Sequence, residues 1–81
     1  MSKSDEIEFI GHIFEELKFV INTTNYLTFE LFIEDETLKR AVVRALEIVG
    51  EATKNLSYDF RQKYNQVPWK LMAGMRDNIW V

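Results

Sequence analysis

The side chains best suited to chemistry in this chain are one histidine and two arginines. His12 is the single histidine, and an imidazole can take up or release a proton near neutral pH. Arg44 and Arg76 carry planar, permanently charged guanidinium groups, which bind and stabilise negatively charged oxygens. His12 falls in a stretch of helical periodicity, and no catalytic motif surrounds it. We therefore expect His12 to be a partly exposed or interface residue with one hydrogen bond, rather than a general base.

Arg44 has two acidic neighbours at helical spacing. Glu47 and Glu51 follow it at steps of three and four residues, so the three side chains share one face of a helix. Two interpretations stay open. The three residues could line a functional cleft, where a carboxylate orients an arginine or acts as a weak base. Alternatively, they form an intrahelical ion pair on a solvated face, which would stabilise the helix by about 0.3–0.5 kcal/mol.

Other kinds of site find little support in the sequence. Acidic residues near the N-terminus show no convergent spacing, and acids in a first helical turn ordinarily interact with the helix dipole. The chain has no cysteine, which excludes a disulfide framework and a thiolate zinc site. It also has no glycine-rich phosphate loop and no Ser–His–Asp arrangement. We expect neither a metal ion nor a cofactor.

A long first helix should carry His12. Ser4 or Asp5 can cap its N-terminus, and the polar run at 22–25 should end it. Apolar residues recur at alternating steps of three and four, which is the period of one broad apolar helical face. That face is expected to consist of Ile7, Ile10, Phe14, Leu17 and Ile21, widened by Phe9, Ile13 and Val20.

A second long helix should carry Arg44. Residues 29–33 should form one or two helical turns after Thr28, and Asp35 should then cap the long helix. Its apolar residues again follow steps of three and four, and they surround so much of the helix that a central position is expected. The stripe consists of Leu38, Val42, Ala45, Val49, Ala52 and Leu56.

The C-terminal part should form shorter helices that end near Arg76. Ser57 can cap a helix over 58–64, and Pro68 suits the first turn of a last segment that Gly74 is expected to interrupt. Aromatic residues gather in this part of the chain. They could stack nucleic-acid bases, but such residues near a bundle end are more often core or interface anchors. We favour a core position for Phe60 and Trp69.

Length and composition limit the possible classes of protein. Eighty-one residues, 47% of them hydrophobic, make one small domain, which buries only about 60–65% of its unfolded surface. The net charge of −3 argues against nucleic-acid binding through bulk electrostatics, although a local basic patch would suffice. The N-terminus is polar with no long apolar run behind it, and no stretch is long enough to span a membrane. We expect a cytoplasmic location.

Three blocks of sequence, in this order and at this spacing, resemble one known family. They are Phe29–Glu36 (FELFIEDE), Ala41–Ala52 (AVVRALEIVGEA) and Val67–Asp77 (VPWKLMAGMRD). Together they resemble the HepT-like branch of the HEPN domains, which are small helical ribonuclease toxins. The resemblance covers roughly residues 5–79. It implies an all-α, up-and-down helical bundle, with two long helices and shorter C-terminal helices, that pairs into a homodimer.

The family resemblance also implies a metal-independent ribonuclease. Its site lies at the dimer interface and holds an arginine and, four to six residues later, a histidine. Arg76 matches the arginine, and Asp77 the polar position that follows it. The family belongs to toxin–antitoxin systems in which a small nucleotidyltransferase is the antitoxin. Arg44, Glu47 and Glu51 would then line the dimer cleft next to Arg76.

Val81 stands where the resemblance places the histidine. The chain therefore looks like a single HepT-like domain, residues 1–81, truncated before the histidine and lacking the family's C-terminal helix. We expect a toxin component whose catalysis is impaired, because a general base typically contributes about 10²–10⁴ in rate. One alternative is a helical interaction module that binds a nucleotidyltransferase antitoxin or an intact toxin subunit. Another is a longer reading frame that encodes an active ribonuclease.

Overall fold

A computed structural model describes the backbone of residues 3–78 and the side chains of residues 5–74. This part of the chain is all-helical, which confirms the predicted fold class. It contains the five helices α1 Lys3–Thr24, α2 Phe29–Glu34, α3 Glu36–Lys54, α4 Tyr58–Lys63 and α5 Trp69–Asn78. No helix among the described residues is both long enough and apolar enough to cross a membrane.

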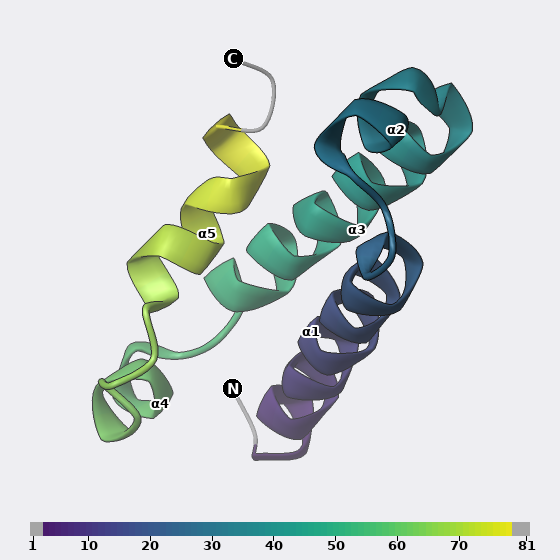
Figure 1. Ribbon diagram of the computed structural model, residues 1–81. Helices are drawn as coiled ribbons and strands as arrows, with labels where there is room; N and C mark the ends of the chain where they lie inside the picture. Colours follow the sequence, from purple (N-terminus) through teal and green to yellow (C-terminus); the bar gives the residue numbers. More distant parts are fainter. Residues whose placement is uncertain (1–2, 79–81) are drawn as a thin grey trace.

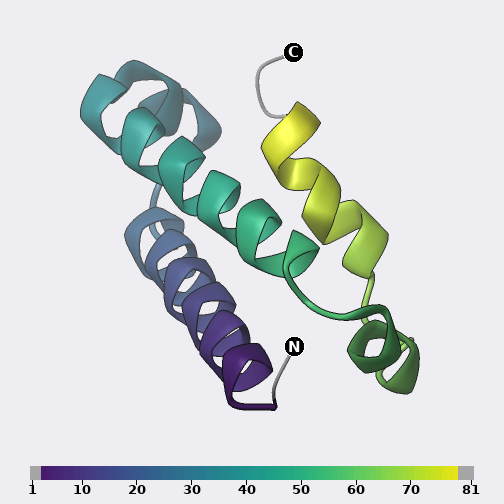
Figure 2. The ribbon, with the colours of Figure 1, turned by 180° about the vertical axis from the view of Figure 1, so that it is seen from behind.

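The three longer helices run up, down and up, with α3 in the middle. Figures 1 and 2 show α1 and α5 on opposite sides of α3, and both helices pack against it. The short helix α2 joins α1 to α3 at one end of the molecule, and α4 joins α3 to α5 at the other. The predicted central position of the second long helix is confirmed.

The core lies where the three helices meet. Its buried side chains come from α1, α3, the turn after α3 and α5: Ile13, Val49, Ala52, Leu56 and Trp69. Val49 has no exposed surface. In the apolar stripe predicted for α3, every residue from Val42 onwards is buried, and Leu38 is half-buried. The period of three and four therefore identified the buried face of α3 correctly.

The buried face of α1 differs from the predicted one. Ile13 is buried there, whereas Ile7, Phe14 and Ile21 are 66%, 62% and 61% exposed. These three residues are spaced by seven, so they form a line along the helix. They lie beside the half-buried Ile10 and Leu17, which pack against the core. The prediction was right for Ile10, Ile13 and Leu17 but wrong for the exposed line, because α1 has two adjacent apolar sides and periodicity alone does not say which one packs.

Side-chain caps begin three of the helices. The Thr28 hydroxyl accepts from Leu31 N at 3.2 Å, and the Asp35 carboxylate accepts from Leu38 N at 2.9 Å. The Ser57 hydroxyl accepts from Phe60 N at 3.1 Å. These bonds satisfy donors that a helix leaves unpaired at its start. The caps predicted at Asp35 and Ser57 are confirmed, whereas neither Ser4 nor Asp5 caps α1, because this helix already begins at Lys3.

The last helix continues past its glycine. α5 is helical from Trp69 to Asn78, so the interruption expected at Gly74 is wrong. A glycine inside a helix costs about 1 kcal/mol relative to alanine. The packing of the half-buried Met72 against the core acts against this cost, because burial of apolar surface stabilises the helix.

Candidate active site

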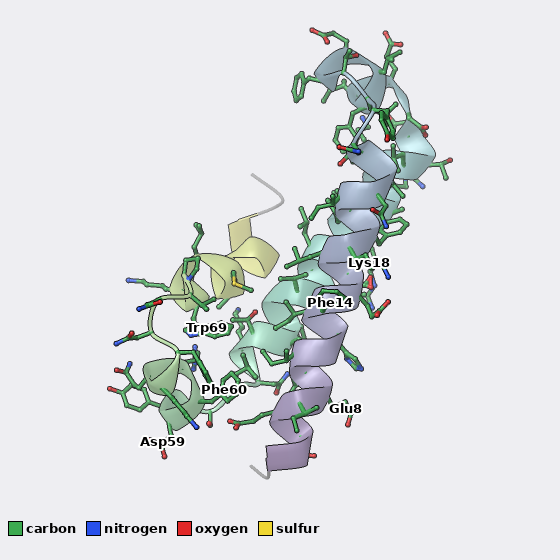
Figure 3. All side chains as sticks on the ribbon, turned by 60° about the horizontal axis from the view of Figure 1, so that its bottom comes forward. Glu8, Phe14, Lys18, Asp59, Phe60 and Trp69 are labelled. Carbon is green, nitrogen blue, oxygen red and sulfur yellow. The ribbon has the colours of Figure 1, made fainter. Side chains whose placement is uncertain are left out.

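The start of α5 is fixed by an aromatic cluster. Trp69 is buried, and its indole N–H donates to the Tyr64 carbonyl oxygen at 3.0 Å. The ring of Phe60 lies between its neighbours, with centroids 5.0 Å from Tyr64 and 6.1 Å from Trp69. Figure 3 shows Phe60 and Trp69 on the inner side of α4 and α5, whereas Asp59 points away. The core positions predicted for Phe60 and Trp69 are confirmed.

Arg76 and Asp77 belong to this anchored helix. They lie in the last turn of α5, seven and eight residues after Trp69, which corresponds to about 10–12 Å along the helix axis. Their side chains lie outside the described residues, as does Val81. The structure thus shows that Arg76 belongs to α5 and that the aromatic cluster holds the start of this helix in place.

The other predicted site residues gather in a groove between α1 and α3. Arg44, Glu47 and Glu51 all line this groove, which has a volume of about 360 Å³. Arg44 and Glu51 are exposed, and Glu47 is half-buried. His12 of α1 lines the same groove. Sequence spacing predicted that the three α3 residues share a face, but it contained no signal that His12 would join them.

Chemically, the groove is a polar surface of mixed charge. An imidazole, a guanidinium and two carboxylates meet there, with Asn55 at one end. No residue of α5 with a described side chain lines it. Because α3 lies between α1 and α5 (Figures 1 and 2), this groove and the α5 surface are separated within one chain.

A second hollow, of about 480 Å³, lies between α4 and α5. It is lined by two basic residues, Arg61 and Lys70, together with Tyr58, Gln62 and Asn65. Sequence reasoning considered the aromatic residues of this part of the chain as possible stacking surfaces for bases, but it missed the basic pair. The available signal was the charge distribution, because residues 57–81 carry a net charge of +2 in a chain whose total is −3.

The described side chains of the two hollows do not converge on a metal site. Among the described residues, no three His, Cys, Asp or Glu side chains lie close enough together to hold a metal ion. The chemistry that the described groups can supply is therefore proton transfer and the binding of anions, by His12 and by the arginines and lysines.

Comparison with known proteins identifies the family. The family described as "Ribonuclease HepT-like" matches residues 13–80, which include α3, α4 and α5 completely and all but the first half of α1. The chain belongs to the HepT-like ribonuclease family. Arg76 and Asp77 fall inside the matched region, and so does the groove-lining trio of α3.

Individual HepT-like relatives agree with this assignment. A protein of Methanocaldococcus jannaschii named as a "Putative RNase" is 48% identical over 79 residues, covering 98% of this chain and 65% of the relative. Another "Putative RNase", from Caldanaerobacter subterraneus subsp. tengcongensis, is 49% identical over 71 residues, covering 88% and 63%. A "Probable ribonuclease HepT" of Thermococcus cleftensis is 38% identical over 77 residues, covering 95% and 70%.

The HepT-like chain thus spans about two thirds of the length of the relatives that it matches. No solved structure matches it.

Proposed function

We propose that this HepT-like protein is the ribonuclease toxin of a toxin–antitoxin system, and that it cleaves RNA without a metal ion. Arg76 binds the scissile phosphate and stabilises the negative charge that builds up on its oxygens in the transition state. The proposal rests on the family match over residues 13–80, which includes the α5 helix that carries Arg76. Asp77 is the polar residue that accompanies Arg76 in the site.

The 81 residues contain the arginine of the catalytic pair but no histidine after it, since His12 is the single histidine. Cleavage through the 2′-hydroxyl needs a base to remove its proton, and loss of such a base typically costs about 10²–10⁴ in rate. We propose that the 81-residue chain on its own is for this reason a weak ribonuclease. Position 81, five residues after Arg76, is where the base would stand.

The test is RNA cleavage in the presence of EDTA by the wild-type chain, by Val81→His and by the double variant Arg76→Gln, Val81→His. Cleavage of a labelled single-stranded RNA should be near background for the wild type. It should rise with Val81→His and fall back when Arg76 is also replaced. Val81→Phe is the matched control, because it changes the size of the same residue without adding a base.

Strong cleavage by the wild-type chain that survives Arg76→Gln would contradict the proposal. If such cleavage were lost in His12→Ala instead, the base would belong to the groove between α1 and α3, and the assignment of the site to α5 would fall.

We also propose that the chain forms a homodimer through the outer side of α1. The support is the exposed line of Ile7, Phe14 and Ile21. Burial of a large apolar side chain contributes about 1.5–3 kcal/mol, and a two-fold contact would bury six of them. In Figure 3, Phe14 and Lys18 lie on α1 away from α4 and α5, where a second copy could reach them.

The same exposed line of α1 supports the alternative function of an interaction module. In that case a nucleotidyltransferase antitoxin, or an intact toxin subunit, covers Ile7, Phe14 and Ile21, and no catalysis is needed. Co-expression with the nucleotidyltransferase distinguishes the two. A stable heteromeric complex that is lost in Phe14→Asp, together with no RNA cleavage by Val81→His, would favour the module.

A further inference from the structure

We propose that the hollow between α4 and α5 binds the phosphate backbone of single-stranded RNA and leads the strand along α5 toward Arg76. This inference rests on the proposed ribonuclease function and identifies the surface that holds its substrate. Four observations support it: the charge of the hollow, an unpaired donor on one of the residues that line it, an exposed aromatic ring at its edge, and its position on α5.

The charge of this hollow is uniformly positive. Arg61 of α4 and Lys70 of α5 line it, and none of the residues with described side chains that line it is acidic. The groove between α1 and α3 contains Glu47 and Glu51 beside Arg44, so a phosphate there would meet two carboxylates. A polyanion is therefore attracted to the α4–α5 side, which carries the positive charge of the C-terminal part, and is repelled by the glutamates of the other groove.

Arg61 also has a donor without a partner. Its Nε is buried and makes no hydrogen bond, and it is the single buried side-chain nitrogen or oxygen in this state among the described residues. Such a donor is unfavourable to leave without a partner. A rotation of the Arg61 side chain toward a phosphate in the hollow would give Nε a partner and would form a charge-assisted bond.

The rim of the hollow offers a surface for a base. Tyr58 lines it and is 70% exposed, although a large ring usually gains by burial. Stacking of a nucleobase on such a ring is favourable and tolerates any sequence. Gln62 and Asn65, which also line the hollow, can donate hydrogen bonds to phosphate or ribose oxygens. An unpaired strand suits these groups because its bases are free to stack.

The position of the hollow connects it to the proposed catalytic arginine. Lys70 and Ala73 line it from α5, six and three residues before Arg76. One residue advances an α-helix by 1.5 Å, so Lys70 and Arg76 are separated by about 9 Å along the axis. A strand that runs along α5 from Lys70 therefore passes the helical turn that contains Arg76, and the buried Trp69 holds the start of the same helix.

The inference is tested by fluorescence anisotropy with a fluorescein-labelled, 12-nucleotide single-stranded RNA of mixed sequence. Four proteins are compared. They are the wild-type chain, the single variant Lys70→Gln, the double variant Arg61→Gln/Lys70→Gln, and the double variant Lys18→Gln/Arg40→Gln. The last variant is the matched control, because it removes two exposed positive charges from α1 and α3. Circular dichroism checks that each variant is folded. Lys70→Gln is included because exposed Lys70 can be changed without disturbing the core, whereas Arg61 is half-buried.

Each phosphate contact to a single strand contributes about 0.7 to the slope of log affinity against log salt. At 0.1 M salt, Lys70→Gln should therefore raise the Kd about fivefold, and the double variant about twenty-five-fold with a slope lower by about 1.4. The control should stay within about twofold of the wild type. Equal weakening by the control, or no binding by the wild type at low salt, would overturn the inference.

Binding and cleavage are read separately, so the two proposals can fail separately. If Val81→His cleaves RNA and the α4–α5 variants bind it as tightly as the wild type, the inference fails and the ribonuclease proposal stands. If no variant cleaves RNA but Lys70→Gln still weakens binding, the hollow is an RNA-binding surface and the ribonuclease proposal fails.

Discussion

The carboxylate of Glu6 accepts two hydrogen bonds from Ser57, one from its backbone N–H at 3.3 Å and one from its hydroxyl. The same hydroxyl accepts from Phe60 N. Glu6 thereby ties the start of α1 to the first turn of α4, 51 residues further along the chain. A negative charge at this place also interacts favourably with the N-terminal end of the α4 dipole.

Glu6→Ala should lower the free energy of unfolding by about 1–2 kcal/mol, because it removes two hydrogen bonds to a charged acceptor at a half-buried site. Urea denaturation followed by circular dichroism measures the change. Glu8→Ala is the matched control, since Glu8 is an exposed carboxylate on the same helix. Its effect should stay within about 0.5 kcal/mol, and equal effects of the two variants would contradict a specific role for Glu6.

Replacement of Trp69 should separate its packing from its hydrogen bond. Trp69→Ala removes a buried indole from the core and should cost about 3–5 kcal/mol, enough to unfold a small domain. Trp69→Phe keeps most of the packing but loses the bond to the Tyr64 carbonyl, and should cost about 1–2 kcal/mol. The measurement is again urea denaturation. If Trp69→Phe were as harmful as Trp69→Ala, the hydrogen bond rather than the packing would hold α5.

Phe14→Asp should convert the proposed dimer to a monomer without loss of helix content, because Phe14 lies at the middle of the exposed line on α1 and makes no contribution to the buried core. Sedimentation equilibrium at micromolar concentration gives the mass. Tyr26→Ser is the control, since Tyr26 is 92% exposed and lies outside α1. A wild-type monomer, or a Phe14→Asp dimer, would refute the proposed interface.

The pKa of Glu36 should be lower than that of an ordinary glutamate. A hydrogen bond from Lys39 is the main cause, and the charge of that lysine adds to it. The pair therefore stabilises the fold at pH values above the pKa of the unfolded glutamate, and the contribution disappears as the pH falls through the lowered folded pKa. An NMR titration of the Glu36 side chain should show the lowered pKa in the wild type and its return toward the usual range in Lys39→Gln.

Much of this fold could be predicted from local sequence signals. Asp35 and Ser57 indicated the starts of α3 and α4, because a cap needs only the chain within three residues of it. The buried stripe of α3 was correct because this helix is covered on two sides, so most of its apolar residues find a neighbour. The three blocks of sequence, the last of which contains Arg76, predicted the family because their order and spacing can be seen along the chain alone.

Other features depended on partners far along the chain. Nothing near Glu6 indicated that its carboxylate would reach Ser57. In α1, the lines through Ile7 and through Ile13 have nearly equal periodicity, and the approach of α3 decides between them. The hollow at Arg61 and Lys70 forms only when α4 and α5 are placed side by side, so sequence spacing did not reveal it.

The central position of α3 also determines where this chain can change over evolutionary time. Val49 and Ala52 belong to the core cluster that contains side chains of both α1 and α5. A substitution at either position must therefore pack against both helices. Phe14, in contrast, does not pack in the core. The residues on the outer side of α1 are consequently constrained by what binds them and not by the core, and a descendant could exchange one binding partner for another there while its bundle stays intact.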